Sequence, residues 1–82
     1  MSLDRIRLAR KRTIGTNQTT KALQQGQVEV VYVAKDAEHR VTAPIVSLAN
    51  QRGLNVVWVD TMKQLGKACG IEVGAAAAAV IK

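Results

Sequence analysis

Two runs of apolar residues predict the central strands of a β-sheet. Residues 28–34 form an almost unbroken run of β-branched and aromatic side chains, and residues 56–59 form a second, shorter run. Unbroken apolarity is typical of strands that are covered on both faces, so we predict two buried strands. The alanine-rich segment 75–81 predicts a further strand, although alanine alone favours helix, because Gly74 breaks the element before it.

Helical patterns separate these strands. Residues 17–25 place Thr19, Ala22 and Leu23 on one face, which is small and apolar enough to pack. Gly26 follows at the position where helices commonly end. Three further helices are predicted over residues 2–11, from Thr42 or Ala43 to Gly53, and from the capping box at 61–64 to Gly70.

The order of these elements predicts the fold class. A short extended segment at 12–15 is interpreted as an edge strand, so helices and strands alternate along the chain. Alternation predicts an α/β fold, a three-layer α/β/α sandwich in which helices cover both faces of a four-stranded mixed sheet. With 82 residues and no long linker, the chain is expected to form a single domain over residues 1–82.

The start of helix 17–25 carries the most informative polar residues. Thr16 is expected to cap the helix, and Gly15 lets another backbone approach closely. At 100° per residue, Asn17 and Lys21 project from the same exposed face. Unpaired N–H groups at a helix start favour phosphate, and amide and ammonium groups can contact base edges. Taken alone, this pattern supports an RNA-reading helix and an ordinary solvated helix face about equally.

The distribution of charge favours a polyanionic partner. The formal net charge is +6 and the sequence pI is about 10.1. Residues 1–21 hold six basic residues and one acidic residue, so nearly all the excess lies in the first quarter of the chain. A run this localised indicates binding to a nucleic acid rather than a merely solubilising segment.

Catalytic and metal sites are not indicated. The pair at 66–67 resembles the end of a phosphate-binding P-loop, but Ala68 stands where a hydroxyl residue is required. His39 falls in a charged loop and Cys69 falls on the apolar side of a helix, so they form no base–nucleophile pair. No Cys/His cluster has metal-ligand spacing. We therefore predict a protein that is not an enzyme and uses no cofactor or metal.

Cysteine usage and hydropathy predict a cytoplasmic protein without membrane contact, and the protein is expected to be a monomer. The single cysteine, Cys69, suits a reducing compartment. The N-terminus is charged and lacks the apolar stretch of a signal peptide. The apolar run 75–81 is far shorter than the ~20 residues that span a bilayer.

Two longer motifs make the sequence specific. Gly-Thr-Asn-Gln-Thr-Thr-Lys-Ala-Leu at 15–23 resembles one signature of the kink-turn-binding ribosomal protein family, that of the archaeal ribosomal protein L-seven-Ae and its eukaryotic relatives. Residues 65–74, with the alanine run after them, resemble the other signature, and residues 31–36 fit the strand and loop between. The resemblance covers essentially the whole chain and is greatest to short bacterial ribosomal-like members. It implies the α/β/α sandwich already predicted.

The resemblance also implies recognition of the kink-turn, a sharply bent RNA internal loop with tandem sheared G·A pairs, in ribosomal or another structured RNA. Gly15 and Thr16 would approach the RNA backbone at the bend. Asn17 and Lys21 would contact the guanines of the sheared pairs, with Gln18 beside them.

A second segment would complete the site that the resemblance implies. The 71–73 loop would place Ile71 and Val73 against a nucleotide flipped out of the stack, with Glu72 between them. Phosphate contacts would come from Lys11, Arg12 and Lys35.

Two positions depart from the family pattern. Gln18 stands where archaeal members commonly carry Glu, and Lys35 replaces a usually acidic residue. Both changes raise the local positive charge, which should increase salt-sensitive affinity at some cost in discrimination. The alternative is a small ribosome-associated module for protein interaction or assembly, in which the 71–73 loop docks a partner protein.

Overall fold

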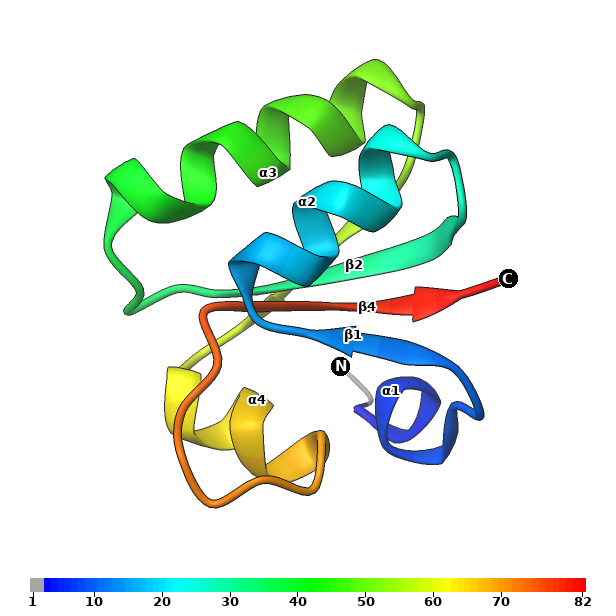
Figure 1. Ribbon diagram of the computed structural model, residues 1–82. Coiled ribbons are helices and arrows are strands. Elements are labelled where there is room, and N and C mark those ends of the chain that lie inside the picture. Colours follow the sequence, from blue (N-terminus) through cyan, green and yellow to red (C-terminus); the bar gives the residue numbers. More distant parts are fainter. Residues whose placement is uncertain (1–2) are drawn as a thin grey trace.

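A mixed sheet lies between two layers of helices (Figure 1). The computed structural model describes residues 3–82, and within them the sheet has four strands in the order β1-β4-β2-β3. The strands are β1 (Arg12–Ile14), β2 (Val28–Ala34), β3 (Val56–Val59) and β4 (Ala77–Ile81). β2 and β3 pair in parallel, whereas β4 is antiparallel to both β1 and β2. The predicted three-layer α/β/α sandwich with a mixed sheet is confirmed.

The helices cover the two faces of the sheet in pairs. They are α1 (Asp4–Leu8), α2 (Thr16–Gln24), α3 (His39–Gln51) and α4 (Met62–Ala68). α2 and α3 lie on one face, and α1 and α4 lie on the other (Figure 1). No helix within residues 3–82 has the length and apolarity to cross a membrane.

The central strand β2 supplies both halves of the core. Its side chains alternate between the faces, so Val31 and Val33 pack under α2 and α3, whereas Tyr32 and Ala34 pack under α1 and α4. A register shift between Val28 and Val30 interrupts the pairing with β4. The prediction of a central strand covered on both faces is therefore confirmed for β2.

Alanines fill the strand next to β2. Ala77, Ala78 and Ala79 in β4 are completely buried. β4 runs between β1 and β2, and helices pack on both of its faces, so methyl groups occupy space where larger side chains would not fit. The prediction of a strand from this segment is confirmed, because tertiary packing overrides the helical preference of alanine.

The prediction that β3 is buried was wrong. β3 lies at the edge of the sheet, and Trp58 is 42% exposed. The side chains of Val56 and Val57 are only half-buried. An unbroken apolar run does not distinguish a central strand from an edge strand, because that difference depends on the order in which strands pair.

Two helix boundaries also differ from those predicted. α1 begins at Asp4 and ends at Leu8 because Ala9 takes an extended conformation, and Ser2, which lies in the predicted range 2–11, is outside the described residues. α3 begins at His39 rather than at Thr42 or Ala43, so Pro44 lies inside it. Proline removes the hydrogen bond to the carbonyl four residues before, that of Arg40. Arg40 is exposed near the helix start, where water can replace that bond.

Candidate nucleic-acid interface

Three helices begin at the same end of the sheet. β1, β2 and β3 run in one direction, and they lead into α2, α3 and α4 respectively. The helix starts therefore lie together, beside the loop that joins α4 to β4 (Figure 1). The first N–H groups of a helix lack intrahelical partners and carry partial positive charge, so this end of the molecule favours anions.

The N-terminus of α4 is closed by side chains. The Met62 N–H group donates to the Asp36 carboxylate at 2.7 Å, and the Gln64 N–H group donates to Thr61 Oγ1 at 3.0 Å. The second bond confirms the predicted capping box threonine. α2 differs, because its N-cap residue makes no side-chain hydrogen bond to the first N–H groups of the helix. The α2 N-terminus is therefore open to an external anion.

Gly15, and not Thr16, is the N-cap of α2. The φ angle of Gly15 is +95°, which glycine adopts without the strain that a side chain would bring. Its N–H group donates to the Ala77 carbonyl oxygen at 2.8 Å, which joins the start of the helix to β4. The prediction that Thr16 caps the helix was wrong, because the switch from strand to helix falls one residue earlier and makes Thr16 the first helical residue.

The first turn of α2 is anchored to β1 by side chains. The hydroxyl oxygens of Thr13 and Thr19 lie 2.8 Å apart, within hydrogen-bond distance. Gln18 Oε1 accepts a long hydrogen bond of 3.4 Å from the Ile14 N–H group, on the outer edge of the sheet. Gln18 therefore has a local structural contact through its oxygen, and this leaves the donors of its amide group to face outward.

The two faces of α2 are as predicted. Thr19, Ala22 and Leu23 are buried. Asn17 and Lys21 are exposed, one turn apart on the opposite face. These two side chains stand at and just beyond the open helix N-terminus.

The segment 71–74 is held firmly against α4. The Ile71 N–H group donates to the Gly66 carbonyl oxygen, and the Ala75 N–H group donates to the Met62 carbonyl oxygen, both at 3.0 Å. A Cβ atom on Gly66 would lie 2.0 Å from the Val73 carbonyl oxygen, so only glycine allows this approach. A glycine inside a helix was the available signal of close packing.

The loop exposes one of its two apolar side chains. Val73 is 71% exposed, whereas Ile71 is half-buried and packs against the core under α1 and α4. Glu72 between them is exposed. The loop thus offers an aliphatic surface to solvent on a backbone that is fixed by hydrogen bonds.

The fold brings the α2 N-terminus and this loop to the same end of the sheet (Figure 1). Gly15 is bonded to Ala77, and Val73 lies four residues before Ala77. Four residues of extended chain span at most about 14 Å. One RNA internal loop could therefore touch both segments.

The predicted phosphate ligands are in three different settings. Lys35 Nζ lies 3.3 Å from Asp60 Oδ1 in an exposed ion pair. Lys11 lies at the other end of β1, where its carbonyl oxygen accepts from the Ile81 N–H group at 3.0 Å. Arg12 is hydrogen-bonded to the protein itself: Nη1 donates to the carbonyl oxygens of Ile6 and Arg7, and Nη2 donates to that of Cys69.

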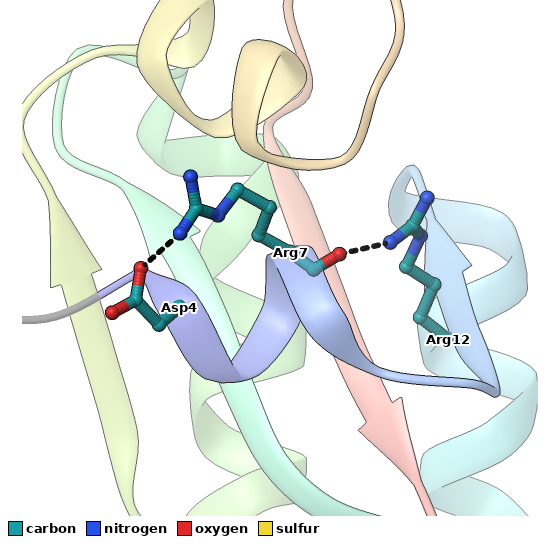
Figure 2. A network of polar contacts seen from close by, with 3 residues as sticks. All are labelled: Asp4, Arg7 and Arg12. Atoms are coloured by element: carbon teal, nitrogen blue, oxygen red, sulfur yellow. Dashed lines mark hydrogen bonds and ion pairs between the residues drawn. The ribbon is translucent and has the colours of Figure 1, made fainter.

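The Arg12 contacts connect distant parts of the chain. Figure 2 shows the bond to the Arg7 carbonyl, together with the ion pair between Arg7 and Asp4 at 2.7 Å. These bonds join β1 to the end of α1 and to the residue that follows α4. Sequence reasoning missed this role, because a local basic run gives no information about carbonyl groups elsewhere in the chain.

Residues 2–82 match the sequence model of the ribosomal protein L7Ae/L30e/S12e/Gadd45 family. The chain belongs to this family. The family is not enzymatic, so the prediction that the chain is not an enzyme is confirmed.

Relatives within the family include small bacterial proteins of the same length. The chain is 51% identical over 81 residues to an RNA-binding protein of Bacillus pumilus, with 99% of each chain covered. It is 44% identical over 82 residues to the RNA-binding protein YbxF of Geobacillus stearothermophilus, with 100% of both covered. It is 46% identical over 68 residues to the large ribosomal subunit protein eL8 of Halobacterium salinarum, covering 82% of this chain and 57% of that protein.

Solved structures of the same fold agree with the family assignment. The 15.5kD RNA binding protein of Giardia lamblia superposes with a TM-score of 0.87 at 23% identity, covering 98% of this chain and 70% of that chain. At this identity the likeness shows the fold alone. The superposition supports the fold of this chain, a mixed sheet with helices on both faces.

Proposed function

We propose that this protein is an RNA-binding module that recognises and stabilises kink-turns in ribosomal or another structured RNA. The observation that carries the proposal is the uncapped N-terminus of α2, which presents Asn17 and Lys21 beside the rigid loop that exposes Val73. Family membership and the RNA-binding relatives of equal length support an RNA partner. Ribosomal RNA is one candidate target, since a large-subunit ribosomal protein is among the relatives.

The backbone at the start of α2 would hold the RNA at its bend. The first N–H groups of the helix lack side-chain partners, and the positive end of the helix dipole favours a phosphate there. Gly15 has no side chain to obstruct the approach, and apart from its chain neighbours no atom of residues 3–82 lies within 4 Å of where a Cβ would be. Thr16 adds a hydroxyl group at the first helical position.

The exposed face of α2 would read the sheared base pairs. Guanine presents two acceptors, O6 and N7, to which the Lys21 ammonium group can donate. The Asn17 amide both donates and accepts, so it can bond to the edges of a G·A pair. The oxygen of Gln18 is turned to Ile14, so its NH₂ group is the part that would face a base.

The 71–73 loop would receive the flipped nucleotide. Exposed Val73 and half-buried Ile71 give an aliphatic platform for a base, in place of the aromatic side chains that stack bases in other RNA-binding modules. Glu72 stands between them with a carboxylate that accepts a hydrogen bond from a base amino group. Because the loop is fixed to α4 by two backbone bonds, little ordering would be needed on binding.

The three basic residues would contribute in different ways. Lys35 would exchange its exposed partner Asp60 for a phosphate, since surface ion pairs contribute only about 0–1 kcal/mol. Arg12 uses its guanidinium group on three carbonyl oxygens and would offer its remaining donors to the RNA. Lys11 would reach phosphates beyond the far end of β1.

A titration separates kink-turn recognition from general RNA binding. The protein is titrated with a kink-turn RNA and with a copy in which the G·A pairs are replaced by Watson–Crick pairs, at the same salt concentration. We expect the kink-turn to bind at least about tenfold more tightly, since each specific contact contributes about 1–3 kcal/mol. Equal affinity for the two RNAs would refute the proposal, and sedimentation of the complex tests the expectation that the protein binds as a monomer.

A further inference from the structure

Half of the basic side chains without a partner gather at the end of the sheet opposite to the α2 N-terminus. Within residues 3–82, six basic side chains have neither an acidic partner nor a hydrogen bond to the backbone. They are Arg10, Lys11, Lys21, Lys63, Lys67 and Lys82. Three of these, Arg10, Lys11 and Lys82, line one groove. We call it the basic groove.

The basic groove is formed by α1, the start of β1 and the end of β4. Its volume is about 610 Å³, and Leu8, Ala9 and Ile81 lie beside the three cations. Leu8 is 74% exposed at its rim. The acidic residue Asp4 also borders the groove, but its carboxylate is held by Arg7 at 2.7 Å. The unpaired charge in the groove is therefore positive.

The backbone fixes the positions of these cations. The Ile81 N–H group donates to the Lys11 carbonyl oxygen at 3.0 Å, and the Lys82 N–H group donates to the Gln27 carbonyl oxygen at 2.8 Å. Lys11 and Lys82 are thus attached to neighbouring strands of the sheet. This arrangement differs from a flexible basic tail, because the spacing of the charges is set by the fold.

A shallow trough leads from α2 to the basic groove. It has a volume of about 230 Å³ and runs between α2 and β1. Its lining includes Gln18, Lys21, Gln25 and Thr13, and it shares Ile81 with the basic groove. No acidic side chain of the described residues lines the trough. Amide, hydroxyl and ammonium groups therefore form a path from the exposed face of α2 to the three cations.

We propose that the path from Lys21 to the basic groove holds the sugar–phosphate backbone of one stem of the RNA whose internal loop binds at the α2 N-terminus. This inference rests on the proposed function. The distance between Lys11 and Gly15 along β1 is about 13 Å, at about 3.3 Å per residue. A duplex has several phosphates over such a length, since one charge occurs about every 1.7 Å of its axis. Phosphates need donors and cations, which the path provides, and the acid that borders the groove within residues 3–82, Asp4, is paired with Arg7.

The test compares kink-turn RNAs with different stems. Each of the two stems is lengthened separately by one helical turn, and binding is measured over a range of salt concentrations. The wild-type protein should gain affinity when one particular stem is lengthened. The slope of log affinity against log salt concentration should become steeper by about one to two. Each phosphate that is neutralised releases about one counterion.

Two matched variants distinguish a local contact from a general effect of charge. Arg10→Gln/Lys82→Gln lowers the net charge by two within the basic groove. Ser47→Glu/Asn50→Asp lowers it by the same amount on the exposed side of α3. The first variant should lose the gain from the longer stem and keep its discrimination for G·A pairs. The second should keep the gain, with a small uniform loss of affinity on all RNAs. Thermal melting checks that both variants are folded.

Three outcomes would overturn the inference. Wild-type protein that gains nothing from either stem would show that the basic groove does not contact RNA. If the two variants lose the same amount of affinity, the basic groove acts only through the net charge of the protein. Binding of poly-glutamate that depends on Arg10 and Lys82, without any gain from a longer stem, would assign the groove to an acidic protein partner. If the wild-type protein does not discriminate between the kink-turn and the RNA without G·A pairs, the proposed function is refuted instead. Failure of the inference and failure of the proposed function therefore give different results.

Discussion

Arg12 donates a hydrogen bond of 2.8 Å from Nη2 to the carbonyl oxygen of Cys69, although 57 residues separate the two along the chain. Its Nη1 donates to the carbonyl oxygens of Ile6 and Arg7, both at 3.1 Å. One side chain on the edge strand therefore satisfies carbonyl groups at the ends of both helices on that face. Arg12 has a structural role that precedes any contact with RNA.

Replacing Arg12 by Lys should lower the free energy of unfolding. A lysine ammonium group is a compact charge on a flexible stem and does not reproduce the fork of donors that reaches three carbonyl groups. Hydrogen bonds with a charged partner contribute about 1.5–3 kcal/mol, so we expect a loss of that size in urea unfolding. Arg10→Lys is the control, since Arg10 makes no such bond within residues 3–82, and equal stability of the two variants would contradict this role.

Asn17→Ala and Lys21→Ala should each weaken binding to a kink-turn RNA by about 1–3 kcal/mol. Both side chains are exposed, so the melting temperature should barely change. Isothermal titration gives the affinity, and calorimetric melting gives the stability. Gln24→Ala, an exposed change one turn further along α2, serves as control and should bind like the wild-type protein. A loss of stability that equals the loss of affinity would contradict a direct contact.

Gly66→Ala should destabilise the protein and weaken RNA binding together. The new Cβ atom would lie 2.0 Å from the Val73 carbonyl oxygen, so the 71–74 segment must move away from α4. Overpacking of this kind costs about 1–3 kcal/mol. Gly74→Ala is the graded comparison, because its nearest contact would be 3.0 Å to Met62 Cβ, and a smaller loss is expected. Chemical unfolding and RNA titration of both variants check the order.

Gln18→Glu should lower overall RNA affinity and sharpen discrimination for the kink-turn. The carboxylate can still accept from the Ile14 N–H group but has no donor, and the net charge falls by one. The salt dependence of binding should therefore become shallower. Gln51→Glu makes the same charge change at an exposed position at the end of α3, away from α2 and the trough. If both variants behave alike in titrations against the two RNAs, position 18 carries no specific role.

Cys69 should be inert towards alkylating reagents near neutral pH. The side chain is 1% exposed, and burial raises the pKa of its thiol, an effect that the Arg12 guanidinium only partly opposes. A raised pKa means that the folded state keeps the proton. This contribution to stability is complete below the ordinary cysteine value of about 8.5 and is lost as pH rises through the higher folded value. Alkylation rates in native buffer and in denaturant check this, and equal rates would contradict burial.

The parts of the fold that depend on local pattern could be predicted from the sequence. The limits of β2 follow from its apolar run, and the buried face of α2 follows from the helical period. The prediction of two buried strands failed for β3, because its valines do not reveal that the strand has a neighbour on one side only. Pro44 led to a late start for α3, because a proline in the second turn resembles one in the first.

The candidate site could likewise be predicted only in the parts that depend on local sequence. Asn17 and Lys21 lie on the exposed face that the helical period indicates. The roles of Arg12 and Gly66 could not be found this way, since each depends on a carbonyl group that only the folded chain brings near. Motif resemblance placed the 71–73 loop in the site, but it could not show that Ile71 is partly covered.

The three alanines of β4 also affect how the two segments of the candidate site are spaced. Gly15 is hydrogen-bonded to Ala77 in this strand, and the 71–74 segment leads directly into it. The strand therefore sets the separation between them. Ala77, Ala78 and Ala79 are completely buried between the two helix layers, so a larger side chain at any of them would press on the helices packed over that face. In the proposed complex, the spacing between the two segments that face the RNA would thus be set by methyl groups that do not touch it.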